Sequence, residues 1–357
     1  MIKIAEKLTP DENGTNLIPA ILRLAGGIWF TARVSAIHII ASIFDKAGIH
    51  KETLRKKFIE LCSEETPMIR RAVAGRIGEL SHKMDWDVYL TEIMPVFKTL
   101  ASDDQDSVRI LCIDSLILIS KVFTKDLNKT HMIPILIQLT RDKAWKVRSN
   151  LAKLFPSVAE ALGKDITDTS LVNIFSTLLQ DPEGDVRNIA VTSLSKFATI
   201  MSPEKYTIIM PIVFSLIADT LPLVRAGAAE VLSVMSVHLS KEVLQKKVHP
   251  AIRTSINDEH DIEVQMEIIK SIKNIAATIG NDFFTLLNEL NFKKYQEAPN
   301  WRVRDCILDL IIDIAEHFKS TEMFEAHLSG FFMHFLDDKC FSIRMKGVAR
   351  LPVIFLV

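Results

Sequence analysis

One short motif recurs along the chain and constrains its fold more than any other feature. The motif is a valine or isoleucine followed by arginine, with an acidic residue six positions before the arginine. The clear copies pair Asp103 with Arg109, Asp142 with Arg148, Asp181 with Arg187, Asp219 with Arg225, and Asp338 with Arg344. Weaker copies run from Glu64 to Arg70, from Asp258 to Gln265 and from Glu297 to Arg304, and Arg33 marks a degenerate first copy.

The spacing of this motif predicts a repeat protein. The marker positions 33, 70, 109, 148, 187, 225, 265, 304 and 344 follow one another in steps of 37 to 40 residues. A proline keeps the same phase, 14 residues before the marker at Pro19, Pro95, Pro134 and Pro211, and 15 residues before it at Pro250. A sustained period of about 39 residues is typical of a solenoid whose unit is a pair of helices.

We therefore expect an all-α fold, a right-handed α-α superhelix that forms a single solenoid over residues 1–357. The marker predicts about nine units, the last one truncated, at residues 16–48, 49–86, 87–125, 126–164, 165–203, 204–241, 242–281, 282–320 and 321–357. A terminal repeat needs a polar outer face, and the abrupt start and apolar final residues lack one. This suggests that further repeats are missing at both ends.

Each unit is expected to hold a shorter A helix, a tight A–B turn and a longer B helix. One B helix shows the expected apolar face, formed by Val108, Leu111, Cys112, Ser115, Leu116 and Ile119. The A helices carry the phased proline, and a proline within a helix loses a hydrogen bond and crowds the preceding turn. We therefore predict a bend or break in each A helix. Glycines close three B helices, at Gly48, Gly163 and Gly280.

The recurring acid and arginine predict a structural ladder. The acid lies just before the B helix, where it can accept from backbone N–H groups and favour the positive end of the helix dipole. Stacking the units would bring each arginine near the acid of a neighbouring unit. The predicted ladder comprises Asp103, Arg109, Asp142, Arg148, Asp181, Arg187, Asp219 and Arg225.

Composition excludes several classes of protein. The net charge is -1, from 43 basic and 44 acidic residues, whereas a nucleic-acid-binding domain usually has a large basic excess. No uncharged apolar run approaches the ~20 residues of a membrane span, and no signal peptide is visible. The four cysteines, Cys62, Cys112, Cys306 and Cys340, are far apart and are predicted to be buried, reduced thiols. We expect a soluble intracellular protein.

No motif in the chain indicates catalysis or a cofactor. A glycine-rich phosphate loop, a G-x-S-x-G elbow and an H-E-x-x-H pair are all missing from the sequence. His317, His327 and His334 form the densest histidine group, but their spacing does not place them on one turn as metal ligands. The acidic cluster at 103–106 is in register with the acids of other units, so we interpret it as a turn and helix cap. No cofactor, metal or small-molecule substrate is expected.

The A–B turns, which we call corners, carry side chains that are unusually large for turns. These are Trp29 with Phe30, Pro67 with Arg70 and Arg71, Trp145 with Lys146, and Trp301 with Arg302. Tryptophan and arginine are frequent interface anchors, although each tryptophan could instead pack over its own helix pair. A continuous row of such residues is easier to explain as a binding ridge.

Several stretches resemble the HEAT-repeat scaffold (A, regulatory) subunits of protein phosphatase 2A. The resemblance is carried by residues 62–72, 100–109 and 143–148, and also by residues 24–31 and 301–304. It extends over residues 16–350 in one register, like the fourth through twelfth of that family's fifteen repeats. Departures from the family are Ile28 in place of an acid, Gln265 in place of the marker arginine, and Asn173 in place of an A-helix proline.

This resemblance implies a scaffold that holds other subunits through its corners. Positions matching the regulatory-subunit side are Glu64, Glu65, Pro67, Arg70, Arg71, Trp145 and Lys146. Trp301 and Arg302 match the corner where contact with the catalytic subunit begins. The implied partners are a phosphatase catalytic subunit and variable regulatory subunits, in the cytoplasm and also the nucleus. A HEAT array that binds another partner, such as tubulin or transport cargo, is the alternative, and an enzyme would require converging histidines or carboxylates.

Overall fold

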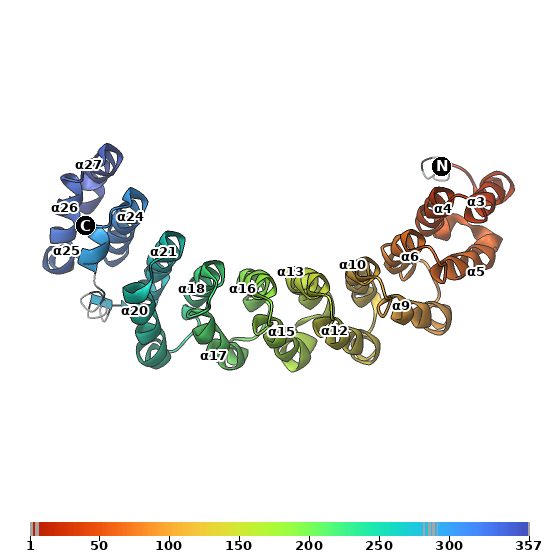
Figure 1. Cartoon of the computed structure of the whole chain (residues 1–357), viewed down its shortest axis with the longest axis horizontal. Coiled ribbons are helices and arrows are strands. Elements are labelled where there is room, and N and C mark those ends of the chain that lie inside the picture. Colours follow the sequence, from red (N-terminus) through yellow and green to blue (C-terminus); the bar gives the residue numbers. More distant parts are fainter. Residues whose placement is uncertain are drawn as a thin grey trace. The chain divides into compact units, whose positions relative to one another are not determined.

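The computed structural model describes residues 3, 7–280, 283, 284, 287, 290 and 292–355. These residues form helices and the turns between them, without a strand, so the predicted all-α solenoid of helical hairpins is confirmed. The chain divides into two compact units, Met1–Leu178 and Leu179–Val357, which we call unit 1 and unit 2. In each unit the A helices form one layer and the B helices another (Figure 1).

Unit 1 contains the first helical hairpins. Its A helices are α3 (Ile18–Ala25), α5 (Lys51–Cys62), α9 (Met94–Leu100) and α12 (Ile133–Thr140), and α15 (Val172–Leu179) ends at the unit boundary. Its B helices are α4 (Phe30–Ile43), α6 (Pro67–Ala74) with α7 (Ile77–Leu80), α10 (Asp106–Val122) and α13 (Trp145–Leu162). Short turns precede these helices or link them: α2 (Pro10–Glu12), η1 (Asn13–Leu17), η2 (Phe44–Lys46), η3 (Gly48–His50), α8 (Trp86–Val88), η4 (Tyr89–Ile93), α11 (Lys125–Leu127), η5 (Asn128–Met132), α14 (Lys164–Ile166) and η6 (Thr167–Leu171).

Unit 2 repeats the arrangement. Its B helices are α16 (Gly184–Ala198), α18 (Pro222–Ser236), α21 (Ile262–Ile279), α24 (Trp301–Phe318) and α27 (Phe341–Phe355). Its A-layer elements are η7 (Pro203–Lys205), α17 (Tyr206–Leu216), α19 (Lys241–Val243), η8 (Leu244–Val248), α20 (His249–Asp258), α23 (Phe292–Gln296), α25 (Thr321–His327) and α26 (Ser329–Leu336).

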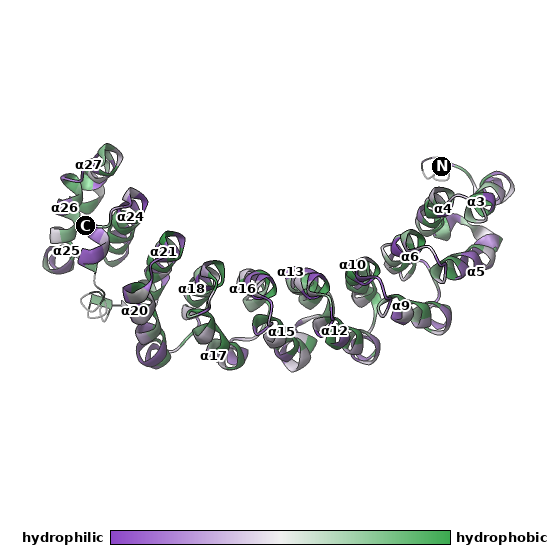
Figure 2. Ribbon diagram, in the orientation of Figure 1, coloured by the Kyte–Doolittle hydropathy of each residue, from purple (hydrophilic) through white to green (hydrophobic). Residues whose placement is uncertain are grey.

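Apolar side chains from both layers make the core of each unit. In α10, Val108, Cys112, Leu116 and Ile119 are fully buried, as the helical spacing of the sequence predicts. Hydrophobic stretches run along the A and B helices of both units (Figure 2). Within the described residues, no helix is both long and apolar enough to cross a lipid bilayer.

Four of the five phased prolines, Pro19, Pro95, Pro134 and Pro250, lie immediately after a widened turn of the A helix; the fifth, Pro211, lies inside the continuous helix α17, where the predicted break is wrong. Pro95 and Pro134 each occupy the second position of an α-helix that follows a five-residue π-helical turn, η4 and η5. The wider turn accommodates the missing amide hydrogen and the ring, which explains how the predicted break occurs. The π turn η6 precedes α15, where Asn173 stands at the proline position, so proline is not required for this geometry.

The cysteine prediction is correct for two residues and wrong in part for two. Cys62 and Cys112 are buried, whereas Cys306 and Cys340 are only partly covered. All four thiols are free. Burial raises the pKa of Cys306 to about 11, so its thiol stays protonated at neutral pH.

One B helix of unit 1 is interrupted, which the apolar pattern does not predict. Helix α6 ends at Ala74, and α7 begins at Ile77. The hydroxyl of Ser115, on the neighbouring helix α10, donates to the Ala74 carbonyl at 2.6 Å and accepts from the Gly78 amide at 3.1 Å. These are the two groups that a continuous helix would join directly. The serine therefore bridges the break, which is a recognised cause of helix kinks.

Candidate partner-binding corners

The corners are fixed from inside by hydrogen-bonded ion pairs. In unit 1, the Arg109 guanidinium donates to both carboxylate oxygens of Asp142, at 2.6 and 2.7 Å, and to the Asp103 carbonyl oxygen of its own corner at 2.6 Å. Asp142 in turn accepts from the Ala144 amide at 2.8 Å. The side chains of Arg109 and Asp142 are only 5% and 6% exposed. Each such rung therefore ties one corner to the next.

The same rung recurs through both units. The pairs are Arg70 with Asp103 in unit 1, and Arg187 with Asp219, Arg225 with Glu259, and Arg304 with Asp338 in unit 2. Burial acts to raise the pKa of Asp103, but hydrogen bonds from Arg70 and from the Gln105 amide outweigh it and hold that pKa below its usual range. The carboxylate therefore stays charged in the rung.

Arg148 and Asp181 lie in different units, and the structure describes their bonds within their own corners. The Arg148 guanidinium donates to the Asp142 carbonyl oxygen at 2.6 Å, and the Asp181 carboxylate accepts from the Glu183 amide at 2.9 Å. Both residues are buried.

Two residues expected at the partner surface belong to the ladder instead. The Arg70 side chain is 15% exposed and its guanidinium is bound to Asp103. The Glu64 carboxylate lies 3.6 Å from Nε of Arg33, a looser first rung. Glu64 and Arg70 occupy the same positions in the repeat as the other ladder residues. The period of the sequence could therefore have assigned them to the ladder and not to the partner surface.

The weaker motif copies are corrected by the structure. The acid that accepts from Arg225 is Glu259, and the side chain of Asp258, the acid chosen from the sequence, lies outside the described part of the structure. Arg304 donates to the Ala298 carbonyl oxygen of its own corner, so Ala298 and not Glu297 occupies the acid position. Gln265 stands at the arginine position, and its one side-chain bond to a described residue is the corner bond, from its amide nitrogen to the Glu259 carbonyl at 2.8 Å. The rung between Gln265 and Ala298 therefore lacks both charges.

Outside this ladder, the corners of unit 1 present large side chains to solvent. Trp145 is 40% exposed at the start of α13, and Lys146 beside it is also exposed. At the preceding α5–α6 corner, Glu65, Pro67 and Arg71 are exposed. The tryptophan is therefore not enclosed by its own helix pair, and the structure leaves these side chains accessible to a partner.

The first corner and the corners of unit 2 show the same exposure. Trp29 is 76% exposed, and Phe30 is also exposed. Trp301 is 47% exposed, and the Arg302 guanidinium lies 6.0 Å from its ring centroid, within range of a cation–π contact. The Asn300 side chain caps this helix by accepting from the Arg302 amide at 2.9 Å.

Further exposed apolar residues, not predicted as anchors from the sequence, lie at the corners. These are Ile28, Met68, Leu221, Leu223, Ile262 and Phe341. Ile262 and Phe341 stand three positions before the marker residue, as Trp145 and Trp301 do. That register was the signal that could have identified Ile262 and Phe341.

The histidines and acids noted in the sequence make no catalytic constellation. The His327 ring stacks on Phe284 with 4.9 Å between centroids, and His317 and His334 each lie edge-on to the following phenylalanine. Asp103 is bound in the ladder. Among the described residues, no group of three or more histidine, cysteine or acidic side chains is placed to hold a metal ion.

Stacked helical hairpins with ladder-braced corners define the chain as a HEAT-like α-solenoid. Residues 79–276, more than half of the chain, match the family described as PIK3R4-like, middle domain, and the chain belongs to that family. A crystal structure of a Kap121p mutant has a similar fold, with a TM-score of 0.66 at 15% identity, and the match covers 94% of this chain and 37% of that chain. A Kap95p structure matches with a TM-score of 0.65 at 14% identity, covering 96% and 47%.

The curated relatives are consistently named as regulatory (A-type), or scaffold, subunits of protein phosphatase 2A. A probable PP2A regulatory subunit of Caenorhabditis elegans is 32% identical over 124 residues, which cover 34% of this chain and 21% of that protein. The beta isoform of the human 65 kDa regulatory (A-type) subunit is 36% identical over 86 residues, covering 24% of this chain and 14% of that protein. The chain spans about a fifth or less of the length of these relatives.

Proposed function

We propose that this chain is a non-catalytic scaffold of a protein phosphatase 2A-type complex. The observation that carries the proposal is the exposure of Trp145 and Lys146 on a corner that the ladder holds rigid. The names of the curated relatives support the scaffold role. A scaffold acts by holding two partners at a geometry and effective concentration that neither has alone.

The proposed contacts divide between the two units. Glu65, Pro67 and Arg71, together with Trp145 and Lys146, are proposed to face a variable regulatory subunit. Trp301 and Arg302 are proposed to begin the contact with a catalytic subunit. Glu64 and Arg70 then act indirectly, by fixing their corner. We further propose that the chain works in the cytoplasm and the nucleus.

Substitution of Trp145 by alanine tests this proposal. A half-exposed tryptophan that becomes buried by a partner contributes ~1–3 kcal/mol, so we expect Trp145→Ala to weaken binding of a PP2A regulatory subunit roughly 5- to 150-fold in calorimetry. Trp86→Ala is the matched control, because Trp86 is also 40% exposed but lies at the start of α8, away from the A–B corners. Equal affinities for Trp145→Ala and the unmodified chain would refute the corner assignment.

A HEAT array for another partner, such as tubulin or transport cargo, is the second candidate. The likeness to karyopherins is compatible with it, but at 14–15% identity this likeness concerns the fold alone. Affinity capture from cell extract distinguishes the two proposals. Recovery of tubulin or cargo without phosphatase subunits would favour the second.

A further inference from the structure

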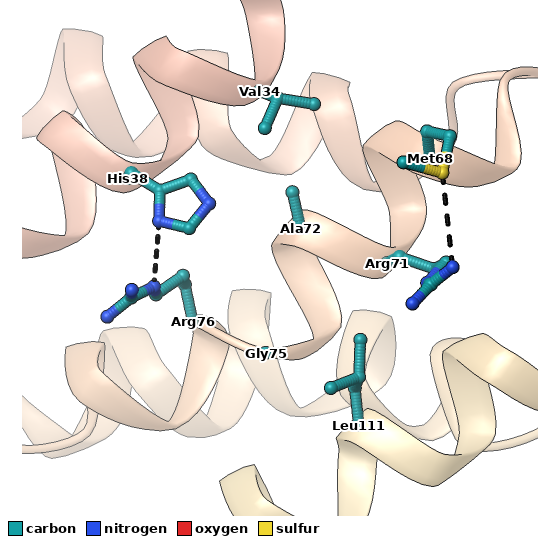
Figure 3. Close-up of a pocket in the computed structure, with 8 residues that line it drawn as sticks. All are labelled: Val34, His38, Met68, Arg71, Ala72, Gly75, Arg76 and Leu111. Atoms are coloured by element: carbon teal, nitrogen blue, oxygen red, sulfur yellow. Dashed lines mark hydrogen bonds between the residues drawn. The ribbon is translucent and has the colours of Figure 1, made fainter. Parts of the chain in front are cut away.

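A pocket in unit 1 begins at the α5–α6 corner, at Met68 and Arg71, and extends along the B-helix face. It has a volume of about 490 Å³ and is lined by Val34 and His38 of α4, Met68, Arg71 and Ala72 of α6, Gly75 and Arg76 at the helix break, and Leu111 of α10 (Figure 3). Three adjacent B helices therefore supply its walls. The size is within the ~300–1,000 Å³ typical of ligand sites.

The pocket carries a positive charge that the described part of the chain does not neutralise. The contact of the Arg71 guanidinium is a weak one, to the Met68 sulfur at 3.9 Å. No carboxylate among the described residues lies within ion-pair distance of Arg71. Arg76, by contrast, is paired with Glu79. Arg71 is thus the cation available to a ligand.

His38 adds a neutral hydrogen-bond donor to the same pocket. Its Nδ1 accepts from Nε of Arg76 at 3.0 Å, so the ring proton is on Nε2. Burial, and then the nearby Arg76 charge, lower the pKa of His38, which keeps the ring neutral near pH 7. Figure 3 shows the ring and Arg71 on opposite sides of Ala72.

The break between α6 and α7 builds the site. Because Ser115 bridges Ala74 and Gly78, the chain can turn at Gly75 and Arg76 without leaving those two backbone groups unsatisfied. The turn places Arg76 against His38, which sets the orientation of the imidazole.

We propose that this pocket binds an acidic segment of a polypeptide, with a carboxylate on Arg71, a second hydrogen-bond acceptor of the same segment on His38, and an apolar neighbour against Met68 and Leu111. The charge of Arg71 selects an anion, and charge-assisted bonds to arginine are about twice as strong as neutral ones. The apolar walls favour a ligand with an apolar part over a free inorganic ion. Met68 is 48% exposed, and an inorganic ion bound at Arg71 would leave it in contact with water. Arg71 is also proposed above to face a regulatory subunit, so the pocket would be part of that contact; the peptide titration tests the pocket itself, whereas Trp145→Ala tests the identity of the partner.

The test uses the full chain and a fluorescein-labelled peptide of sequence LEELEEL in an anisotropy titration. Arg71→Gln is expected to weaken binding at least tenfold. Arg23→Gln is the matched control, because Arg23 is also exposed, lies in unit 1 on α3, and its loss changes the net charge equally. We expect it to change affinity less than twofold. Circular dichroism shows whether both variants remain folded.

Further arms distinguish the ligand chemistries. The peptide LQQLQQL should not bind measurably, whereas a peptide with phosphoserine in place of the second glutamate of LEELEEL should bind at least as well as LEELEEL itself. Equal binding of the glutamine peptide would overturn the proposal in favour of a purely apolar groove. Equal weakening by Arg71→Gln and Arg23→Gln would reduce it to non-specific attraction. Equally tight binding of inorganic phosphate, or of phosphatidylserine vesicles, would overturn the choice of a polypeptide.

Discussion

Removing one arginine from the ladder should be far more costly than removing an exposed ion pair. Arg109→Met deletes three hydrogen bonds and leaves the Asp142 carboxylate, 6% exposed, with only the Ala144 amide as its described donor. Breaking a buried pair by removing one partner costs ~3–5 kcal/mol, because the remaining charge stays desolvated. We therefore expect a loss of this size in local stability. Exposed pairs contribute only ~0–1 kcal/mol.

The assay is native-state hydrogen exchange of the backbone amides around the α9–α10 and α12–α13 corners. Local opening energies are appropriate because solenoid stability is approximately a sum of repeat and interface terms. Lys125→Met is the matched control, since its ion pair with Asp165 is also between neighbouring repeats but is 49% and 75% exposed.

A double substitution separates two effects of Arg109→Met: the loss of the ion pair, and the burial of an unpaired Asp142 carboxylate. In Arg109→Met/Asp142→Leu no buried carboxylate remains, so this variant should be more stable than Arg109→Met alone. If Arg109→Met destabilises the corner no more than Lys125→Met does, the ladder does not brace the corners and the reasoning is refuted.

Two further outcomes follow from the structure. Gly78→Ala should destabilise unit 1 by ~1–3 kcal/mol in thermal or urea unfolding, because the new methyl would lie 2.8 Å from the Ser115 backbone and force α10 away; an unchanged midpoint would contradict the close approach. Acid should weaken the ladder of unit 2. Burial acts to raise the pKa of Asp338, but bonds from Arg304 outweigh it, so the folded pKa is below the unfolded value. The stabilisation is therefore complete above the unfolded pKa, ~4, and is lost as pH falls through the folded value. Unfolding measured from pH 6 to 2 should show this loss, and it should be smaller in Arg304→Met; equal losses would exclude the rung as the source.

The repeat and its corners were predictable because they depend on local, recurring chemistry. A two-helix unit must place an apolar face and a corner at a fixed spacing, so the arginine marker and the exposed Trp145 and Trp301 fall in one register. The arginine-to-acid pairing of adjacent repeats follows from the same register, as Arg109 and Asp142 illustrate.

Other features depend on contacts between repeats, which spacing alone does not determine. The pairing of Arg225 with Glu259 depends on where the A helix ends relative to the neighbouring corner, which the marker spacing leaves open by one residue. The break after Ala74 depends on Ser115, which is 41 residues away along the chain. The apolar pattern continues across that break, so a continuous helix was the simpler expectation.

Because the rung between Gln265 and Ala298 lacks both charges, the corners of unit 2 are not all joined by ion pairs. Between the corners of α21 and α24, Gln265 and Ala298 form no ion pair, whereas the neighbouring corners are joined by Arg225 with Glu259 and by Arg304 with Asp338. Helices α21 and α24 are linked away from the corner instead, by the ion pair of Lys273 with Asp313 at 2.9 Å. When force is applied to unit 2, the α21 and α24 corners should therefore be the first neighbouring corners to move apart. A partner that binds both Ile262 and Trp301 would therefore contact two corners whose separation can change.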